Sequence, residues 1–319
     1  MAELEPGASA TSWERQAIEK VALAAIQEQR RARQWGIFFK LLLFIYLFAL
    51  LFVAMGWFGK KEPAAAKHTA LVQLEGIISP NTQASAENVM AGLQDAFKDR
   101  RTQGVILRIN SPGGSPVQAG HINDEIRRLR AKYPEIPLYA VIEDICASGG
   151  YYVATAADQI YVDKASIIGS IGVIMDGFGF TGTLEMLGVE RRLLSAGDNK
   201  GFLDPFSPMV ESQKEHAQQM LSQIHEQFIN VVRQGRGKRL KESPDMFSGL
   251  LWVGQKSVEI GLADALGSVE YVAREVIKAE DIVDFTPREN IAERLAKKFG
   301  TGMAEGLARF TGVGTMQVR

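Results

Sequence analysis

An uncharged apolar run at residues 41–58 divides this chain of 319 residues into a short N-terminal part and a long C-terminal part. A helix over the run would be about 27 Å long at 1.5 Å per residue, which matches the hydrocarbon core of a bilayer. Trp35, Tyr46 and Trp57 are residues that favour the two membrane–water interfaces. We therefore predict an uncleaved transmembrane anchor over residues 37–59.

A cleaved signal peptide is the alternative, and Ala64-Ala65-Ala66 resembles a cleavage site. The preceding region is about 40 residues long and the apolar run exceeds a usual signal core, so the anchor is favoured. The basic residues beside the run are Arg30, Arg31, Arg33 and Lys40 before it, and Lys60, Lys61 and Lys67 after it. This slight bias predicts a single-pass protein with a cytoplasmic N-terminus. Everything after residue 60 would then be periplasmic or otherwise extracytoplasmic.

Composition narrows the class of protein further. The formal net charge of −1 offers no strong field for nucleic acid, so no nucleic-acid partner is predicted. The single cysteine, Cys146, excludes an intramolecular disulfide. Cys146 is either a nucleophile or a small buried residue, and free cysteine is commonly buried.

Beyond the anchor, strand-like and helix-like segments alternate. Apolar runs rich in β-formers predict strands at residues 71–78, 104–109, 138–142 and 159–163. Helical spacing predicts helices at 87–97, 116–130, 149–157, 211–233, 258–263 and 269–277. Such alternation is typical of an α/β fold with mostly parallel strands. Residues 1–36 form a polar and amphipathic cytoplasmic segment, 60–67 a linker, 68–285 the folded domain and 286–319 an amphipathic C-terminal tail.

Two glycine-containing turns follow successive predicted strands: Asn110-Ser111-Pro112-Gly113-Gly114-Ser115 and Ala147-Ser148-Gly149-Gly150. The carboxyl ends of neighbouring parallel strands meet at one edge of a sheet, so the turns should lie side by side. The N–H groups of Gly114 and Gly149 are then the natural donors for an oxyanion. Spacing alone leaves Ser148 either a nucleophile or a helix N-cap.

A nucleophilic serine needs a base, and two residue types are available. Lys200, followed by apolar Phe202 and Leu203, can act if burial keeps its amine neutral, although a loop lysine is usually a solvated charge. His121 is the histidine alternative, which would complete a Ser-His-Asp triad. His216 and His225 would lie on opposite faces of one helix, so they cannot form a metal site together. We predict no metal and no cofactor.

Together these residues resemble the signal peptide peptidase A family of serine peptidases, group S49, in its short single-unit form. The remaining matching features are Gly169-Ser170-Ile171-Gly172-Val173 and Lys200-Gly201 with Asp204-Pro205-Phe206. The resemblance implies that 68–285 is the peptidase domain and that its fold is ClpP/crotonase-like, built from repeated ββα units. It implies Ser148 as nucleophile, Lys200 as general base and Ser170 as the residue that orients the lysine amine.

The same resemblance implies a homo-oligomeric ring in which one subunit's serine can meet a neighbour's lysine. Membrane lipid and peptide substrates, chiefly remnants of signal peptides, are the other implied partners, and the bacterial inner (cell) membrane is the implied location. Two alternatives remain at this point. One is a crotonase-like acyl-CoA enzyme, which also uses glycine-turn N–H groups to hold an oxyanion. The other is a non-catalytic membrane scaffold that has kept the fold.

Overall fold

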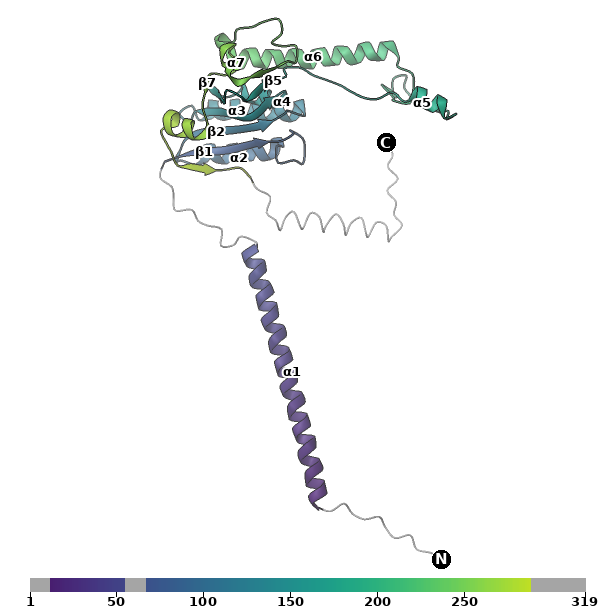
Figure 1. The fold of residues 1–319 in the computed structure, drawn as a ribbon, viewed down its shortest axis with the longest axis vertical. Helices are drawn as coiled ribbons and strands as arrows, with labels where there is room; N and C mark the ends of the chain where they lie inside the picture. Colours follow the sequence, from purple (N-terminus) through teal and green to yellow (C-terminus); the bar gives the residue numbers. More distant parts are fainter. Residues whose placement is uncertain (1–11, 55–66, 288–319) are drawn as a thin grey trace, which may run out of the picture. The chain divides into compact units, whose positions relative to one another are not determined.

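The computed structural model describes residues 12–54 and 67–287 and divides the chain into two units (Figure 1). The first unit contains helix α1 (Ser12–Ala54), and the second comprises residues 62–288 with the sheet and its helices. The predicted linker, apart from its last residue, the end of the predicted anchor and almost all of the C-terminal tail lie outside the described residues.

Helix α1 is continuous over 43 residues. The amphipathic stretch and most of the apolar run therefore belong to one helix. At 1.5 Å per residue α1 is about 64 Å long, roughly twice the thickness of a bilayer core. Trp35 contacts Phe38 edge-on at 5.7 Å and stacks on Phe39 at 5.8 Å, where the apolar run begins. Among the described residues, α1 is the helix long and apolar enough to cross a membrane.

The second unit is a mixed α/β structure around an eight-stranded sheet. Its strands are β1 (His68–Glu75), β2 (Thr102–Ser111), β3 (Leu138–Ala147), β4 (Gln159–Val162), β5 (Ile167–Gly169), β6 (Leu251–Val253), β7 (Ala265–Leu266) and β8 (Ile282–Asp284). The main order is β6-β5-β3-β2-β1-β8, and β4 pairs with both β3 and β7. All pairs are parallel except β5 with β6, as the alternating pattern predicts for most of them.

The sheet divides at β3, which is longer than the predicted strand. Its first half pairs with β4, from Tyr139 to Ile142. Its second half pairs instead with β5, from Ile145 to Ala147. The residue after β3 is Ser148, so the division carries the predicted nucleophile to the rim of the sheet beside the end of β5.

The helices are α2 (Ala86–Lys98), α3 (Pro116–Lys132), α4 (Gly149–Ala154), α5 (Thr181–Met186), α6 (Glu211–Arg236), α7 (Gly254–Glu259) and α8 (Val269–Tyr271). A 3-10 turn, Gly237–Arg239, follows α6, and a π-helical turn, Val272–Ile277, follows α8. The Ser85 and Ser115 side chains cap α2 and α3. The helix predicted at 258–263 is wrong: α7 starts earlier and ends before Gly261, whose φ of +82° requires a turn.

Both faces of the sheet are buried. Leu74, Leu107 and Ile109 belong to one apolar cluster with Leu93 of α2 and Ile126 of α3. A smaller cluster on other strand positions contains Leu71, Ile106, Val141, Val269 and Val272, so the α8 segment belongs to that cluster. Successive side chains of a strand point to opposite faces of the sheet, and both faces are covered. The central strands are therefore continuous apolar runs.

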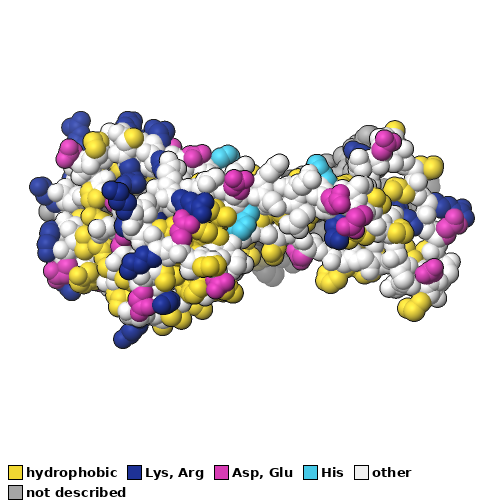
Figure 2. All heavy atoms as spheres, turned by 90° about the horizontal axis from the view of Figure 1, so that it is seen from above, with side chains coloured by type: hydrophobic (Ala, Val, Ile, Leu, Met, Phe, Trp, Pro, Cys, Tyr) yellow, Lys and Arg dark blue, Asp and Glu magenta, His cyan; other side chains and the backbone are white. Residues whose placement is uncertain are grey.

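Residues 173–210, here called the arm, differ from the rest of this unit. None of them is buried, although many are large and apolar. The chain leaves the sheet after β5, passes through α5 and returns along α6, which reaches from the arm to the sheet (Figure 1). From above, a second, smaller lobe with exposed apolar side chains is joined to the main lobe by a narrower, largely polar stretch (Figure 2).

Candidate active site

Ser148 occupies a strained turn between β3 and α4. Its φ of +52° and ψ of −122° are unusual for a residue with a side chain, and such backbone strain costs about 1–3 kcal/mol. Ser148 stands at the N-cap position of α4, but its side chain makes no capping hydrogen bond. The N-cap interpretation therefore does not account for this serine. A strained strand-to-helix turn that leaves the hydroxyl uncommitted is the geometry of a nucleophile elbow.

The two glycine turns lie side by side, as the sequence predicts. A Cβ added to Gly113 would meet the backbone nitrogen of Gly149 and the Cβ of Ser148, each at 2.7 Å. A Cβ added to Gly149 would lie 3.4 Å from the backbone nitrogen of Gly114. The φ angles of Gly113 and Gly114, +102° and +145°, are also ones that other residues rarely adopt. Glycine is thus required where the first turn passes the serine.

The backbone around Gly114 leaves its amide available. Ile78 donates its N–H to the Gly113 carbonyl at 2.9 Å, and Ser115 donates to the Ile78 carbonyl at 2.8 Å. Gly114 lies between these two bonds and its own N–H takes part in neither. The Gly149 N–H lies in the first turn of α4, where amides have no partner within the helix. The rim thus carries two donors of the kind that can stabilise an oxyanion beside Ser148.

Ser170 lies directly beside the Ser148 turn. The register places Ala147 opposite Gly169, and the Ser148 N–H donates to the Gly169 carbonyl at 2.9 Å. Ser170 follows with a φ of +49°, and its N–H donates to the Leu250 carbonyl at 2.8 Å. Ser148 and Ser170 therefore both have a positive φ, which is uncommon for residues other than glycine, and they follow the ends of two neighbouring strands.

Lys200 lies elsewhere, in the arm, and its side chain is exposed. Its neighbours attach to the N-terminal part of α6: the Leu203 N–H donates to Gln213 Oε1 at 3.2 Å, and Gln213 Nε2 donates to Asn199 Oδ1 at 3.5 Å. Further along α6, His225 contacts the Ile171 carbonyl, next to Ser170. The helical rise from Gln213 to His225 is about 18 Å. Within residues 67–287, a single chain thus brings Ser148, Ser170, Gly114 and Gly149 together but not Lys200.

The alternative reactive residues fit less well. His121 is exposed on α3, and no contact joins it to Ser148 in the described part of the chain. Cys146 is fully buried, and burial raises the pKa of its thiol, so the interpretation as a small buried residue is confirmed. His216 packs edge-on against Phe202 in the arm, far along α6 from His225. No cluster of metal ligands occurs among the residues that the structure describes.

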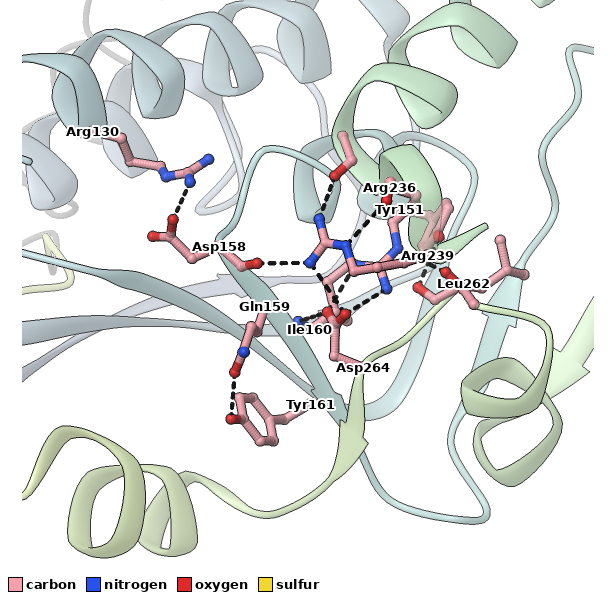
Figure 3. Close-up of polar contacts among 12 residues, drawn as sticks. Arg130, Tyr151, Asp158, Gln159, Ile160, Tyr161, Arg236, Arg239, Leu262 and Asp264 are labelled. Atoms are coloured by element: carbon pink, nitrogen blue, oxygen red, sulfur yellow. Dashed lines mark hydrogen bonds and ion pairs between the residues drawn. The ribbon is translucent and has the colours of Figure 1, made fainter. Parts of the chain in front are cut away.

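A polar network that the sequence does not predict fixes the C-terminal end of α6 (Figure 3). The buried Arg236 guanidinium donates to both oxygens of Asp264, at 2.8 and 2.9 Å, and Arg239 adds a third bond at 3.1 Å. Asp264 also accepts the Ile160 N–H at 2.7 Å, and the Tyr151 hydroxyl donates to the Leu262 carbonyl at 2.8 Å. Burial opposes ionisation of Asp264, but the Arg236 hydrogen bonds and charge outweigh it and lower the pKa.

Comparison with known proteins gives one matching family model, Peptidase family S49, over residues 130–283. A putative protease of Methanocaldococcus jannaschii is 30% identical over 218 residues, which are 67% of this chain and 69% of that protein. A putative signal peptide peptidase, SppA, of Enterococcus faecium is 28% identical over 234 residues, 71% of this chain and 67% of that protein.

A further relative shares a higher identity over a smaller share of its length. The protein named Na(+)/H(+) antiporter NhaA in Brucella melitensis biotype 1 is 44% identical over 177 residues, 56% of this chain. These residues are 24% of that protein, and the match to its Brucella abortus counterpart covers 25%. The chain therefore spans about a quarter of the length of these two curated relatives.

Proposed function

This chain belongs to peptidase family S49, and we propose that it is a membrane-anchored serine peptidase that hydrolyses peptide bonds in remnant signal peptides or other apolar peptides. The observation that carries the proposal is the conformation of Ser148. Its positive φ and uncapped side chain place a strained serine beside the Gly113–Gly114 loop. A structural N-cap requires neither the strain nor the second glycine turn.

The chemistry follows from the groups at the rim. Lys200, as a neutral amine, takes the proton of the Ser148 hydroxyl while Oγ bonds to the peptide carbonyl carbon. The N–H groups of Gly114 and Gly149 stabilise the resulting oxyanion, each worth about 2.7–4 kcal/mol in comparable sites. The lysine then gives its proton to the leaving amine, and the C–N bond breaks. A water molecule, deprotonated by Lys200, hydrolyses the acyl-enzyme, and Ser148 regains its proton. Ser170 orients the lysine amine.

The base in this proposal comes from a neighbouring subunit. Gln213, which bonds the segment that carries Lys200, lies about 18 Å along α6 from His225, whose contact is beside Ser170, and this separation argues against one chain supplying both groups to one site. The arm also exposes apolar side chains that water solvates poorly, among them Leu194 at 97%, Ile174 at 86% and Phe178 at 80% exposure. A homo-oligomeric ring that buries the arms would desolvate Lys200, as a neutral amine requires.

The fold and the anchor complete the proposal. The division of the sheet at β3 fits a ClpP/crotonase-type scaffold. The anchor over residues 37–59, of which α1 covers 37–54, would lie in lipid with the N-terminus cytoplasmic and the peptidase domain, residues 68–285, outside the cytoplasm. A peptidase domain tethered in this way would act on extended apolar peptides released from the membrane, and spent signal peptides are such peptides.

The test uses the full chain in detergent micelles, a fluorophosphonate probe and an apolar peptide substrate. The wild-type chain and the controls Ser222→Ala and Lys256→Ala, both exposed positions, should label and cleave. Ser148→Ala should abolish labelling and cleavage, and Lys200→Ala should abolish cleavage. Retained cleavage in Ser148→Ala would refute the peptidase. Thioester binding without labelling would support an acyl-CoA enzyme instead.

Mixing the two inactive variants tests whether sites are shared. A mixed oligomer contains sites with an intact Ser148 from one chain and an intact Lys200 from the other. We expect mixing to recover part of the wild-type rate. No recovery, with mixed oligomers demonstrated by pull-down of differently tagged chains, would show that each chain carries its own complete site.

A further inference from the structure

His225 of α6 makes a polar contact that reaches the candidate site. Its Nε2 lies 3.1 Å from the carbonyl oxygen of Ile171, the residue after Ser170. A carbonyl oxygen only accepts, so Nε2 carries the proton and donates. The imidazole is half-buried, and the Ile171 side chain is fully buried. The bond therefore joins the helix that carries the arm to the turn that carries Ser170.

The Ser170 turn is held on three sides. The carbonyl of Gly169 accepts from the Ser148 N–H at 2.9 Å, and the N–H of Ser170 donates to the Leu250 carbonyl at 2.8 Å. The Ile171 carbonyl accepts from His225. Three successive residues are thus bonded to three different elements: the nucleophile turn, the segment before β6, and α6. This arrangement explains how Ser170 keeps a φ of +49° that an unsupported chain would avoid.

The donor itself is held rigidly. Phe228 is one turn further along α6, on the same face as His225, and its ring packs against Tyr152 of α4 at 5.2 Å. Arg236 fixes the end of α6 through Asp264. A hydrogen bond from such a helix defines the position of the Ile171 carbonyl, whereas a bond from a loose surface residue would not.

We propose that His225 is a positioning residue for the reaction: it fixes the Ser170–Ile171 backbone and so aims the Ser170 hydroxyl at the incoming lysine amine. This rests on the proposed function, in which Ser170 orients Lys200. His225 touches neither substrate nor the reacting atoms and acts only through the Ile171 carbonyl. Both the neutral Nε2–H tautomer and the protonated ring donate from Nε2, so the support does not depend on the charge of His225.

The first test compares three α6 variants in the full chain. His225→Ala removes the donor, His225→Gln restores an N–H near the Nε2 position, and Gln227→Ala is a matched exposed control. We expect His225→Ala to lower kcat roughly 10- to 100-fold with KM unchanged, because a displaced catalytic group loses rate rather than ground-state binding. His225→Gln should recover kcat to within about threefold of wild type, since it restores the hydrogen bond.

A double-mutant cycle separates positioning from general loss of stability. If His225 acts through Ser170, His225→Ala should lower kcat by less than about threefold when Ser170→Ala is already present. Full additivity of the two losses would overturn the proposal, as would His225→Gln remaining as slow as His225→Ala while unfolding at the wild-type temperature. If His225→Ala does not fold, His225→Gln and its thermal unfolding curve test the proposal instead.

Failure of this inference is distinguishable from failure of the proposed function. If fluorophosphonate labels Ser148 and Ser170→Ala is slow, yet His225→Ala turns over like wild type, only the role of His225 is wrong. If Ser148→Ala still cleaves peptide, the proposed function itself fails and the cycle has no meaning for catalysis.

Discussion

The body of the second unit and the arm differ in how far their side chains are buried. The body, residues 67–172 and 211–287, buries both faces of its sheet and holds Ser148 between backbone hydrogen bonds. The arm, residues 173–210, buries no residue and presents large apolar side chains to solvent. A single chain therefore holds the proposed nucleophile and the proposed oxyanion donors in a buried framework, but it leaves the proposed base on an exposed surface.

The two regions have different roles in the proposed enzyme. Backbone strain at Ser148 and Ser170 persists only where the surroundings over-determine it, and the body provides such surroundings. A lysine becomes an effective base only when it is desolvated, and the arm achieves that only when something covers it. Changes in the body should thus alter folding and intrinsic reactivity, whereas changes in the arm should alter association and activity with little effect on folding.

The largest expected effect is on the body, through Asp264→Asn. The substitution leaves the Arg236 guanidinium, 1% exposed, without its charged partner. Removing one member of a buried ion pair destabilises a protein by about 3–5 kcal/mol. Urea unfolding of the full chain, followed by tryptophan fluorescence, measures the change.

The matched control for that prediction is Glu259→Gln, which breaks the exposed Lys256–Glu259 pair on α7. Exposed pairs contribute about 0–1 kcal/mol, so this variant should unfold close to wild type. Equal destabilisation by the two substitutions would mean that the Arg236 network does not hold α6 to the body.

A second change in the body, Gly114→Ala, tests the proposed role of the Gly114 amide as an oxyanion donor. The added Cβ would clash with the Ile78 carbonyl oxygen, and the alanine would have to adopt a φ of +145°, so the loop must move. Displacing one donor costs about 2.7–4 kcal/mol of transition-state stabilisation, or roughly 10²- to 10³-fold in kcat. Steady-state cleavage of an apolar peptide measures it.

Gly120→Ala provides the comparison, because a Cβ on this glycine of α3 meets nothing within 4 Å. Alanine favours a helix over glycine by about 0.8–1.0 kcal/mol, so this variant should be slightly more stable and fully active. If Gly114→Ala retained wild-type kcat, the amide of Gly114 would not contribute to catalysis.

Local sequence patterns predict the body well because its elements are set by local chemistry. Paired glycines after successive apolar strands imply adjacent turns, and Gly113 does pass Ser148 in contact. The position of Lys200 relative to Ser148 has no such local signal, since it depends on how far α6 carries the arm. Arg236 and Asp264 look like ordinary surface charges in the sequence, and only tertiary packing reveals that they pair in a buried site. The continuity of α1 is likewise hidden, because the sequence changes from polar and amphipathic to apolar along one helix.

Leu194→Ala, in the arm, should separate association from folding. Leu194 is 97% exposed, so truncating it should leave the unfolding free energy within about 0.5 kcal/mol of wild type. The same truncation in the body, Leu107→Ala at a fully buried position, should cost about 2–5 kcal/mol. If the arm is covered in an oligomer, Leu194→Ala should weaken association about tenfold or more, equivalent to at least ~1.4 kcal/mol.

Sedimentation velocity in detergent, over a range of protein concentrations, measures this association. Leu194→Ala should lose oligomer and peptide cleavage in parallel, while fluorophosphonate labelling of Ser148 falls less. This result would support a base supplied across the interface. A Leu194→Ala chain that associates like wild type would show that this part of the arm remains uncovered in the oligomer.

The smallest effect concerns pH, and it again contrasts the two regions. The pKa of Asp264 is lowered in the folded body, so the unfolded chain binds the proton at higher pH than the folded one. The stabilisation is therefore complete above the unfolded pKa of about 3.9 and is lost as pH falls through the folded value. The difference in unfolding free energy between wild type and Asp264→Asn should shrink on acidification from pH 6 to below pH 4.

Asp204 in the arm also has a lowered pKa, through the Ser207 hydroxyl and then Arg191. The side-chain partners of Asp204 lie in the arm, so Asp204→Asn should leave the pH dependence of body unfolding unchanged. If Asp204→Asn changed that pH dependence as Asp264→Asn does, the arm and the body would fold as one cooperative unit.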